Sequence, residues 1–246
     1  MPHPSVSLQL YTLRHAMATD LAGTLQRVAD IGFVNVEPYA FTDRPEEYRS
    51  ALAATGLSAP SGHAPLLAMS EPRAALEAAR SLGMSVVVDP YTEPERWSSR
   101  EEIVRIADGL GSLADLAEEV GMEVGYHNHA WEFSSQIGGA AAFDFFVAAL
   151  DSRVVLEIDT YWVEVGGGSA TEVLTRFGDR VRLIHVKDGP ISPDTDQQVG
   201  VGEGAMDVPG ILAAAPTAIR VIELDSYAGD VFEPVERSLR YLKAQS

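Results

Sequence analysis

The sequence contains no cysteine, which excludes disulfides and thiolate metal sites anywhere in its 246 residues. Any metal would therefore be held by histidine, aspartate, glutamate and water. No apolar run approaches the roughly 18 residues that a membrane-spanning helix needs, so no membrane partner is expected. The first residues also lack the basic region and the apolar core of a secretory signal, and a cytoplasmic location is expected.

Positive charge is scarce. The chain has 18 Lys and Arg against 36 Asp and Glu, a formal net charge of −18. A field of that sign repels phosphate backbones, so binding to nucleic acid is not expected. One lysine or arginine is still enough to hold a single phosphorylated small molecule. The apolar fraction of 46% supplies a sizeable core and argues against disorder.

Short apolar runs alternate with helical patterns along the whole chain. The runs are residues 6–10, 32–36, 57–60, 85–88, 122–126, 154–158, 181–186 and 219–224. The helical patterns are residues 19–31, 45–55, 71–82, 100–120, 140–150, 170–177, 208–214 and 232–243. Eight strand-helix units in a chain near 250 residues predict an α/β protein with one (β/α)8 TIM-barrel domain over residues 1–246. An open doubly wound sheet is disfavoured, because residues 9–14 lack the glycine-rich loop that it needs.

Ionisable side chains gather at the predicted carboxyl ends of these strands, where a barrel places its chemistry. The set is Glu37, His63, Asp89, His127, His129, Asp159, His185, Lys187 and Glu223. Four of them come from consecutive strands and are predicted to bind a divalent metal: His127, Asp159, His185 and Glu223. Imidazole and carboxylate suit such an ion, and burying several carboxylates without a cation would cost several kcal/mol.

Other charged residues have simpler interpretations. Glu157 is expected to be an internal hydrogen-bonding group. Asp188 and Asp225 are expected to be solvated loop charges, and His3 and His15 are expected at the surface.

The densest polar stretch is residues 125–133, which holds two histidines, a tryptophan and a glutamate. Alternate residues of a strand share a face, so His127 and His129 are expected to point the same way if the strand continues. Glu132 follows closely, and the sequence leaves open whether His127 or Glu132 is the fourth metal ligand.

Six motifs resemble the sugar phosphate isomerase/epimerase family of xylose isomerase-like TIM barrels. They are Gly62-His63-Ala64-Pro65, Tyr126-His127-Asn128-His129, Leu156-Glu157-Ile158-Asp159-Thr160-Tyr161-Trp162, His185-Val186-Lys187-Asp188, Gly202-Glu203-Gly204 and Ile222-Glu223. The resemblance covers nearly the whole chain in the family's order. It implies a divalent metal, manganese, magnesium, cobalt or zinc, bound by Glu, Asp, His and Glu. Asp159, His185 and Glu223 match the last three ligands, and His127 stands where the family has its first glutamate.

The resemblance implies an isomerase or epimerase of carbohydrate metabolism, acting on a small sugar or keto-sugar through a metal-stabilised enediolate. Glu223 is expected to be the base, with His129 or Glu132 as its acid/base partner and Lys187 neutralising the oxyanion. Contacts with the substrate are expected from Glu37, His63, Tyr11, Trp162 and Glu203.

The histidine at position 127 also resembles inosose dehydratase-like members, which eliminate water from a keto-cyclitol. A lyase of that type is the first alternative, and a non-catalytic sugar-binding role is the second. The sequence leaves open the sugar and its phosphorylation, the metal, and whether the chain forms a homo-oligomer.

Overall fold

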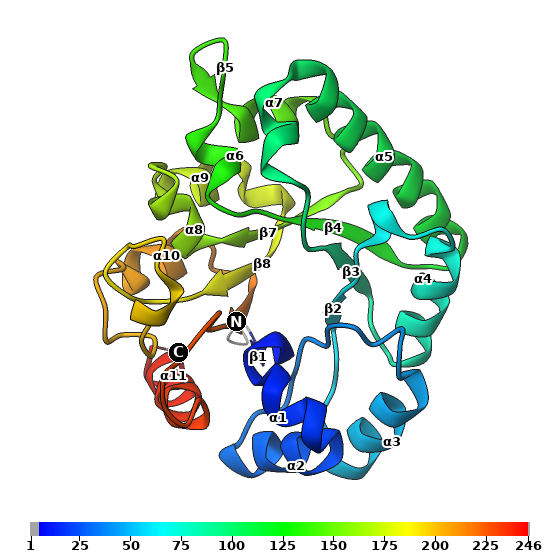
Figure 1. Ribbon diagram of the computed structural model, residues 1–246, viewed down its shortest axis with the longest axis vertical. Coiled ribbons are helices and arrows are strands. Elements are labelled where there is room, and N and C mark those ends of the chain that lie inside the picture. The colour runs from blue at the N-terminus through cyan, green and yellow to red at the C-terminus, as the bar shows by residue number, and fades with distance from the viewer. Residues whose placement is uncertain (1–4, 246) are drawn as a thin grey trace.

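Seven parallel strands form one curled sheet in the order β1-β9-β8-β7-β4-β3-β2 in the computed structural model, which describes residues 5–245. The strands are β1 (Val6–Leu8), β2 (Ser61–His63), β3 (Val86–Asp89), β4 (Glu123–His127), β7 (Val155–Asp159), β8 (Val181–Val186) and β9 (Ile219–Ile222). Figure 1 shows these strands in the centre, with the helices around them. The expected surface residue His3 lies outside the described residues, and His15 is exposed.

An irregular segment, residues 34–39, fills the gap between β1 and β2. Isolated parallel bridges pair Gln9 with Glu37, Asn35 with Ser58, and Tyr39 with His63. Pro38 lies near the end of the segment and has no N–H to donate to a ladder, so bridges replace a regular strand there. The predicted TIM barrel is thereby confirmed.

The third predicted strand is misplaced. The apolar run at residues 57–60 contributes one bridge, at Ser58, and the regular strand β2 begins only at Ser61. The run precedes the strand, whose paired residues are Ser61, Gly62 and His63. A pattern of apolar residues could not show that shift.

Eleven α-helices lie within residues 5–245. They are α1 (Arg14–Thr19), α2 (Leu21–Ile31), α3 (Pro45–Thr55), α4 (Pro72–Ser81), α5 (Arg100–Glu119), α6 (Trp131–Ser134), α7 (Ala142–Ala149), α8 (Thr160–Val165), α9 (Ala170–Phe177), α10 (Val208–Ala214) and α11 (Phe232–Ala244). A small hairpin of β5 (Gln136–Ile137) and β6 (Ala140–Ala141) precedes α7 and takes the first residues of the helix predicted at 140–150. None of the helices in this part of the chain is long and apolar enough to cross a membrane.

Local sequence explains where α2 begins and ends. The Asp20 side chain accepts a hydrogen bond from Gly23 N at 2.9 Å and so caps the first turn. Gly32 ends the helix with φ of 105°, a left-handed conformation that favours glycine.

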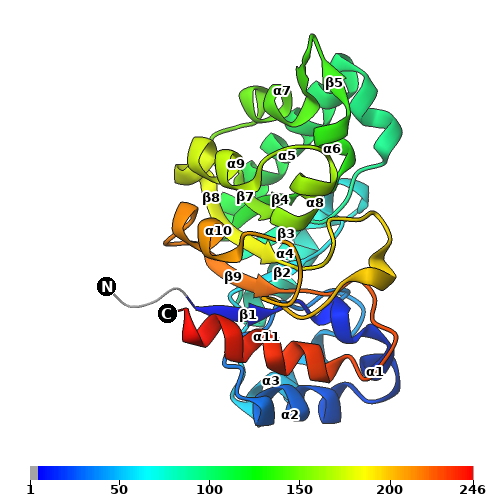
Figure 2. The same ribbon diagram turned by 90° about the vertical axis from the view of Figure 1, so that its left-hand side faces the viewer.

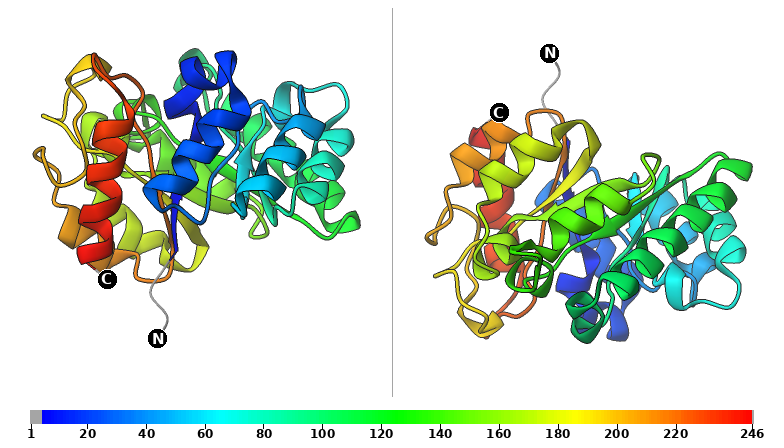
Figure 3. Two further views of the ribbon diagram at one scale, coloured as in Figure 1. Left: turned by 90° about the horizontal axis from the view of Figure 1, so that it is seen from below. Right: turned by 90° about the horizontal axis from the view of Figure 1, so that it is seen from above.

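Helix α11, the last helix in the sequence, contacts the first strand-helix unit. Helix α11 lies next to α2, as Figures 2 and 3 show. The Arg27 guanidinium lies 3.8 Å from the centre of the Phe232 ring, and Lys243 Nζ donates to Gly32 O at 3.0 Å. The contact joins the last helix to the first strand-helix unit.

The inside of the barrel has an apolar layer below the predicted site. It consists of Val86, Val88, Val155, Leu183 and Val221. Val155 and Leu183 occupy the same strand face as the polar residues two and four positions later, because side chains alternate along a strand. The carboxyl ends of the strands therefore hold a polar layer on an apolar floor.

Candidate active site

The four predicted metal ligands converge at the carboxyl ends of neighbouring strands. His127 ends β4, Asp159 ends β7, His185 lies near the end of β8, and Glu223 follows β9. The β7–β8 register pairs Asp159 with His185. One ligand atom from each of the four residues lies within 4.8 Å of the others, and all four side chains are buried. We call this group the ligand cluster.

The ligand cluster fits a divalent cation. His185 Nδ1 lies 2.7 Å from Glu223 Oε2, and His127 Nε2 lies 3.7 Å from Asp159 Oδ2. Asp159 Oδ2 is buried and forms an ion pair with Lys187 Nζ at 2.9 Å. Burial raises the pKa of Asp159 to about 6, even though Lys187 and His185 lie nearby and act in the opposite direction. Two imidazoles with two carboxylates form a typical donor set for zinc, cobalt or manganese.

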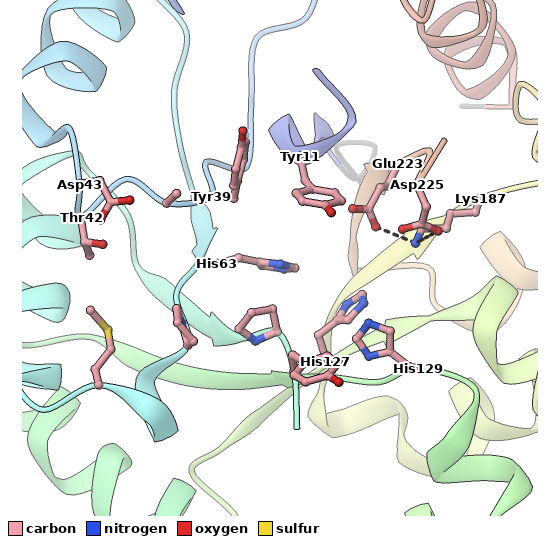
Figure 4. A pocket seen from close by; sticks show the side chains of 15 residues that line it. Tyr11, Tyr39, Thr42, Asp43, His63, His127, His129, Lys187, Glu223 and Asp225 are labelled. Atoms are coloured by element: carbon pink, nitrogen blue, oxygen red, sulfur yellow. Dashed lines mark hydrogen bonds and ion pairs between the residues drawn. The ribbon is translucent and has the colours of Figure 1, made fainter. Parts of the chain in front are cut away.

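Lys187 places a fixed positive charge beside the ligand cluster. Its Nζ lies 2.9 Å from Asp159 Oδ2, 2.9 Å from Glu223 Oε2 and 2.8 Å from Asp225 Oδ2. Burial alone would lower the pKa of Lys187, but these three carboxylates raise it well above its usual value. Figure 4 shows the ammonium group between Glu223 and Asp225.

Asp188 and Asp225 are not the solvated charges that the sequence suggested. Asp225 is partly buried and also accepts a hydrogen bond from Gln198 Nε2 at 2.7 Å. Asp188 is 1% exposed, and its carboxylate accepts hydrogen bonds from the backbone of Gly189, Gly202 and Met206. Both side chains point inward because donors at fixed positions bind their carboxylates. Backbone N–H groups bind Asp188, and Gln198 and Lys187 bind Asp225.

A second pair of carboxylates lies beneath the imidazoles. Glu157 Oε2 lies 2.5 Å from His63 Nε2 and 3.0 Å from His127 Nδ1. Glu37 Oε1 lies 2.9 Å from His185 Nε2. Burial and Glu37 would raise the pKa of Glu157, but His185 and His63 lower it to about 2. Glu157 is thus the internal hydrogen-bonding group expected from the sequence.

Glu37 is too deep for the substrate contact that the sequence suggested. It is 0% exposed, and its two oxygens accept hydrogen bonds from Gln9 and Ser61 as well as facing His185. His63, in contrast, does reach the cavity described next.

A cavity of about 570 Å³ opens above the ligand cluster. His127, His129, Lys187, Glu223 and Asp225 form its polar wall, and Figure 4 shows them facing it. The volume lies within the range of small-molecule sites, about 300–1,000 Å³.

Aromatic side chains form the mouth of the cavity. Tyr11 and Tyr91 are 41% and 47% exposed, and the Tyr11 and Tyr39 rings are 5.4 Å apart. The sequence predicted Tyr11 at the site but missed Tyr39 and Tyr91. Both follow closely after strand-end residues, Glu37 and Asp89, and that position is the signal that could have indicated them.

His129 reaches the cavity although β4 ends at His127. Its ring stacks on Trp131, with the centroids 4.3 Å apart and the planes 7° apart. Burial, followed by the charge of Lys187, lowers the pKa of His129 to about 3, so this imidazole is neutral. Its Nδ1 is buried and has no hydrogen-bond partner within residues 5–245.

Glu132 does not take the place of the missing glutamate ligand. Its carboxylate accepts hydrogen bonds from Tyr126 Oη at 2.8 Å and from His129 N at 2.9 Å. Burial raises its pKa to about 8. Glu132 lies in the short helix α6, and its carboxylate holds the backbone of His129 in place. His127, and not Glu132, belongs to the ligand cluster.

Two further residues expected to contact substrate lie elsewhere. Glu203 is bonded to Arg237 at 2.5 Å on the surface, with 38% of each side chain exposed, and it does not line the cavity. Trp162 is partly buried beside Lys187, whose Nζ lies 5.6 Å from the ring centre, and it does not line the cavity either. The helical turn of α8 carries the indole past the cavity wall.

The description "Xylose isomerase-like TIM barrel" belongs to the family model that matches residues 25–243. The chain belongs to this family. Among solved xylose isomerase-like barrels, a sugar phosphate isomerase/epimerase from Parabacteroides distasonis is 22% identical, with a TM-score of 0.83, over 99% of this chain and 95% of that one. The IolI protein with a bound zinc atom is 16% identical, with a TM-score of 0.74, over 98% of this chain and 97% of that one. At these identities the likeness shows the fold.

Curated relatives carry a different activity in their names. An inosose dehydratase from Clostridium beijerinckii is 30% identical over 131 residues, 49% of this chain and 42% of the relative. An inosose dehydratase from Geobacillus kaustophilus is 28% identical over 172 residues, 63% of this chain and 54% of the relative. The chain thus matches about half the length of these relatives.

Proposed function

We propose that this protein is a metal-dependent lyase that removes water from a keto-cyclitol or a related keto-sugar. The names of the curated relatives support this reaction over the isomerase or epimerase activity that the motifs alone suggest. The ligand cluster and the cavity above it support a metal-bound small substrate.

One observation carries the choice of a lyase: the histidine at position 127 has both ring nitrogens engaged. Nδ1 faces Glu157 at 3.0 Å, and Nε2 faces Asp159 in the ligand cluster. The glutamate that the family has at this position could act as a second base, but this imidazole cannot. Glu132 is bonded elsewhere, so Glu223 is left as the carboxylate base of the ligand cluster.

A single carboxylate is sufficient for elimination of water. Burial would raise the pKa of Glu223, but Lys187 and His185 lower it, so the group is an anion that can accept a proton. Glu223 takes the proton from the carbon next to the carbonyl, and that C–H electron pair forms the new double bond. The neighbouring C–O bond then breaks, and the departing hydroxide takes the proton back from Glu223 as water.

Other residues of the cavity bind and stabilise. When bound, the metal supplies Lewis-acid polarisation of the substrate carbonyl. Lys187 provides a preorganised positive charge for the oxygen that becomes negative. The neutral His129 is a weak base and is suited to hydrogen-bond a substrate hydroxyl, and Tyr11 and Tyr91 offer apolar faces to the ring. Two imidazole ligands favour zinc, cobalt or manganese over magnesium.

Epimerisation is the second candidate. It is favoured by His129 Nδ1, a buried atom of a cavity-lining side chain that has no hydrogen-bond partner within residues 5–245 and could exchange a proton with the substrate.

The proposal is tested with purified protein that has been treated with a chelator and then reloaded with zinc, cobalt or manganese. Addition of a keto-cyclitol is expected to produce an enone absorbance with metal and none after chelation. A substrate panel of keto-cyclitols and keto-sugars that gives no enone with any of the three metals would contradict the lyase assignment.

A further inference from the structure

The two imidazoles of the ligand cluster each face carboxylates on both sides. On the cavity side, His127 Nε2 faces Asp159, and His185 Nδ1 faces Glu223. On the inner side, His127 Nδ1 lies 3.0 Å from Glu157 Oε2, and His185 Nε2 lies 2.9 Å from Glu37 Oε1. A neutral imidazole has one nitrogen that donates a proton and one with a lone pair, so each ring can serve a cation on one side only.

Two groups of side chains could therefore hold a cation. One is the ligand cluster on the cavity side, and the other is an inner group of His63, His127, Glu157 and His185. The two inner oxygens that face these rings, Glu157 Oε2 and Glu37 Oε1, already have donors. Glu157 Oε2 faces His63 Nε2 at 2.5 Å and His185 Nε2 at 3.2 Å as well as His127. Glu37 accepts hydrogen bonds from Gln9 Nε2 and from Ser61 Oγ.

The cavity side differs in its access to a ligand. His127 and Glu223 both line the cavity, and the two cavity-side oxygens, Asp159 Oδ2 and Glu223 Oε2, share the ammonium group of Lys187. A cation on this side can reach a substrate, whereas Glu37 and Glu157 are 0% exposed beneath the rings.

We infer that Glu157 and Glu37 are positioning residues that accept Nδ1–H of His127 and Nε2–H of His185, and so aim one lone pair of each ring at a single cation on the cavity side. A carboxylate that accepts the far N–H of a metal-binding histidine fixes its tautomer and orientation. The inference rests on the metal centre of the proposed function but not on the reaction.

Nitrogen NMR of the zinc-loaded protein tests the tautomers directly, using chain labelled with ¹⁵N-histidine. The expected spectrum has His127 protonated at Nδ1 with zinc at Nε2, and His185 protonated at Nε2 with zinc at Nδ1. The reverse tautomer of either ring would overturn the inference. Zinc bound at the inner position, between His63, His127, Glu157 and His185, would also overturn it, because the inner nitrogens of the two rings would then face a metal and not a carboxylate.

Zinc affinity in variants gives an independent readout. Glu157→Gln is expected to weaken zinc binding about 10- to 100-fold, the usual effect of losing such a partner. Asp89→Asn is the matched control, because Asp89 is also a buried carboxylate but accepts only the backbone N–H groups of Leu67 and Tyr91. Unchanged zinc affinity in folded Glu157→Gln protein would overturn the inference.

The two proposals fail in different ways. A wild-type chain that takes up no zinc contradicts the metal centre and this inference together. Zinc bound with the reverse tautomers contradicts the inference and leaves the metal centre standing. If Glu157→Gln does not fold, the NMR measurement on the wild-type chain still decides the question.

Discussion

The ammonium nitrogen of Lys187 forms an ion pair with the buried Asp159 Oδ2 at 2.9 Å. The same nitrogen lies 2.9 Å from Glu223 Oε2. A cation of the protein therefore balances two carboxylates that are also candidate metal ligands. Removing Lys187 leaves Asp159 and Glu223 without this neutralising charge.

Lys187→Met is expected to bind a divalent metal more tightly and to be less stable without it. The metal-free variant should lose about 3–5 kcal/mol of unfolding free energy, because buried carboxylates lose their partner. Turnover should fall, since the charge that stabilises the oxyanion is gone. Metal titration by calorimetry and urea unfolding with and without metal measure both effects. Weaker metal binding in a folded variant would contradict this account of Lys187.

Asp159→Asn is expected to separate metal binding from folding. Asp159 Oδ1 caps α8 by accepting hydrogen bonds from Tyr161 N and Trp162 N, and asparagine caps helices equally well. The metal-free variant should therefore fold, and it should lose less stability than Lys187→Met because Lys187 keeps Glu223 and Asp225 as partners. Metal affinity should fall more than about 100-fold, because a ligand has more effect than its supporting partner. An unchanged metal affinity would remove Asp159 from the ligand cluster.

Glu132 is expected to make stability depend on pH. Its pKa of about 8 in the folded state lies above its ordinary value of 4.5, so the folded chain holds the proton longer than the unfolded chain. The contribution to stability is present below pH 4.5 and is lost as the pH rises through 8, with a slope of up to about 1.4 kcal/mol per pH unit.

The comparison is between wild type and Glu132→Gln, which cannot titrate. Urea unfolding of the metal-free proteins at about pH 5.5 and about pH 7.5 should show wild type losing stability relative to the variant. Glu203→Gln, a change at the surface, serves as the control and should follow wild type. Parallel curves for wild type and Glu132→Gln would contradict the raised pKa.

Glu203→Ala is expected to leave the Michaelis constant unchanged. Glu203 is paired with the exposed Arg237, and such surface pairs contribute under about 1 kcal/mol. A steady-state assay with a keto-cyclitol measures the Michaelis constant, and a thermal melt measures the small loss of stability. A Michaelis constant raised several-fold would instead support the substrate contact that the glycine-flanked motif suggested.

The strand-end residues were predictable because strand alternation and barrel geometry bring them together whatever the loops do. His127, Asp159, His185 and Glu223 needed only the order of the strands. Glu132 and Trp162 were harder, since each lies one helical turn beyond a strand, and the start of that turn decides where the side chain points. Glu203 depended on a partner, Arg237, that lies 34 residues away in the sequence.

The irregular segment shows a different limit. Apolar runs predicted strands at residues 32–36 and 57–60, but Pro38 and Pro60 limit the ladder hydrogen bonds that can form there. The barrel was predicted correctly, but neither of these two runs forms a regular strand. The protonation states could not be predicted from the sequence either. The pKa of Glu132 is raised because its carboxyl group is buried, whereas the pKa of Glu223 is lowered because Lys187 and His185 lie beside it.

The most direct measurement of the central claim is the mass spectrum of a keto-cyclitol after incubation with the manganese-loaded protein in deuterated water. The account predicts a product lighter by one water, formed only with metal and lost in Glu223→Gln. Recovered starting material of unchanged composition that carries deuterium would indicate an epimerase instead. Neither water loss nor deuterium uptake across the substrate panel would contradict the proposed chemistry.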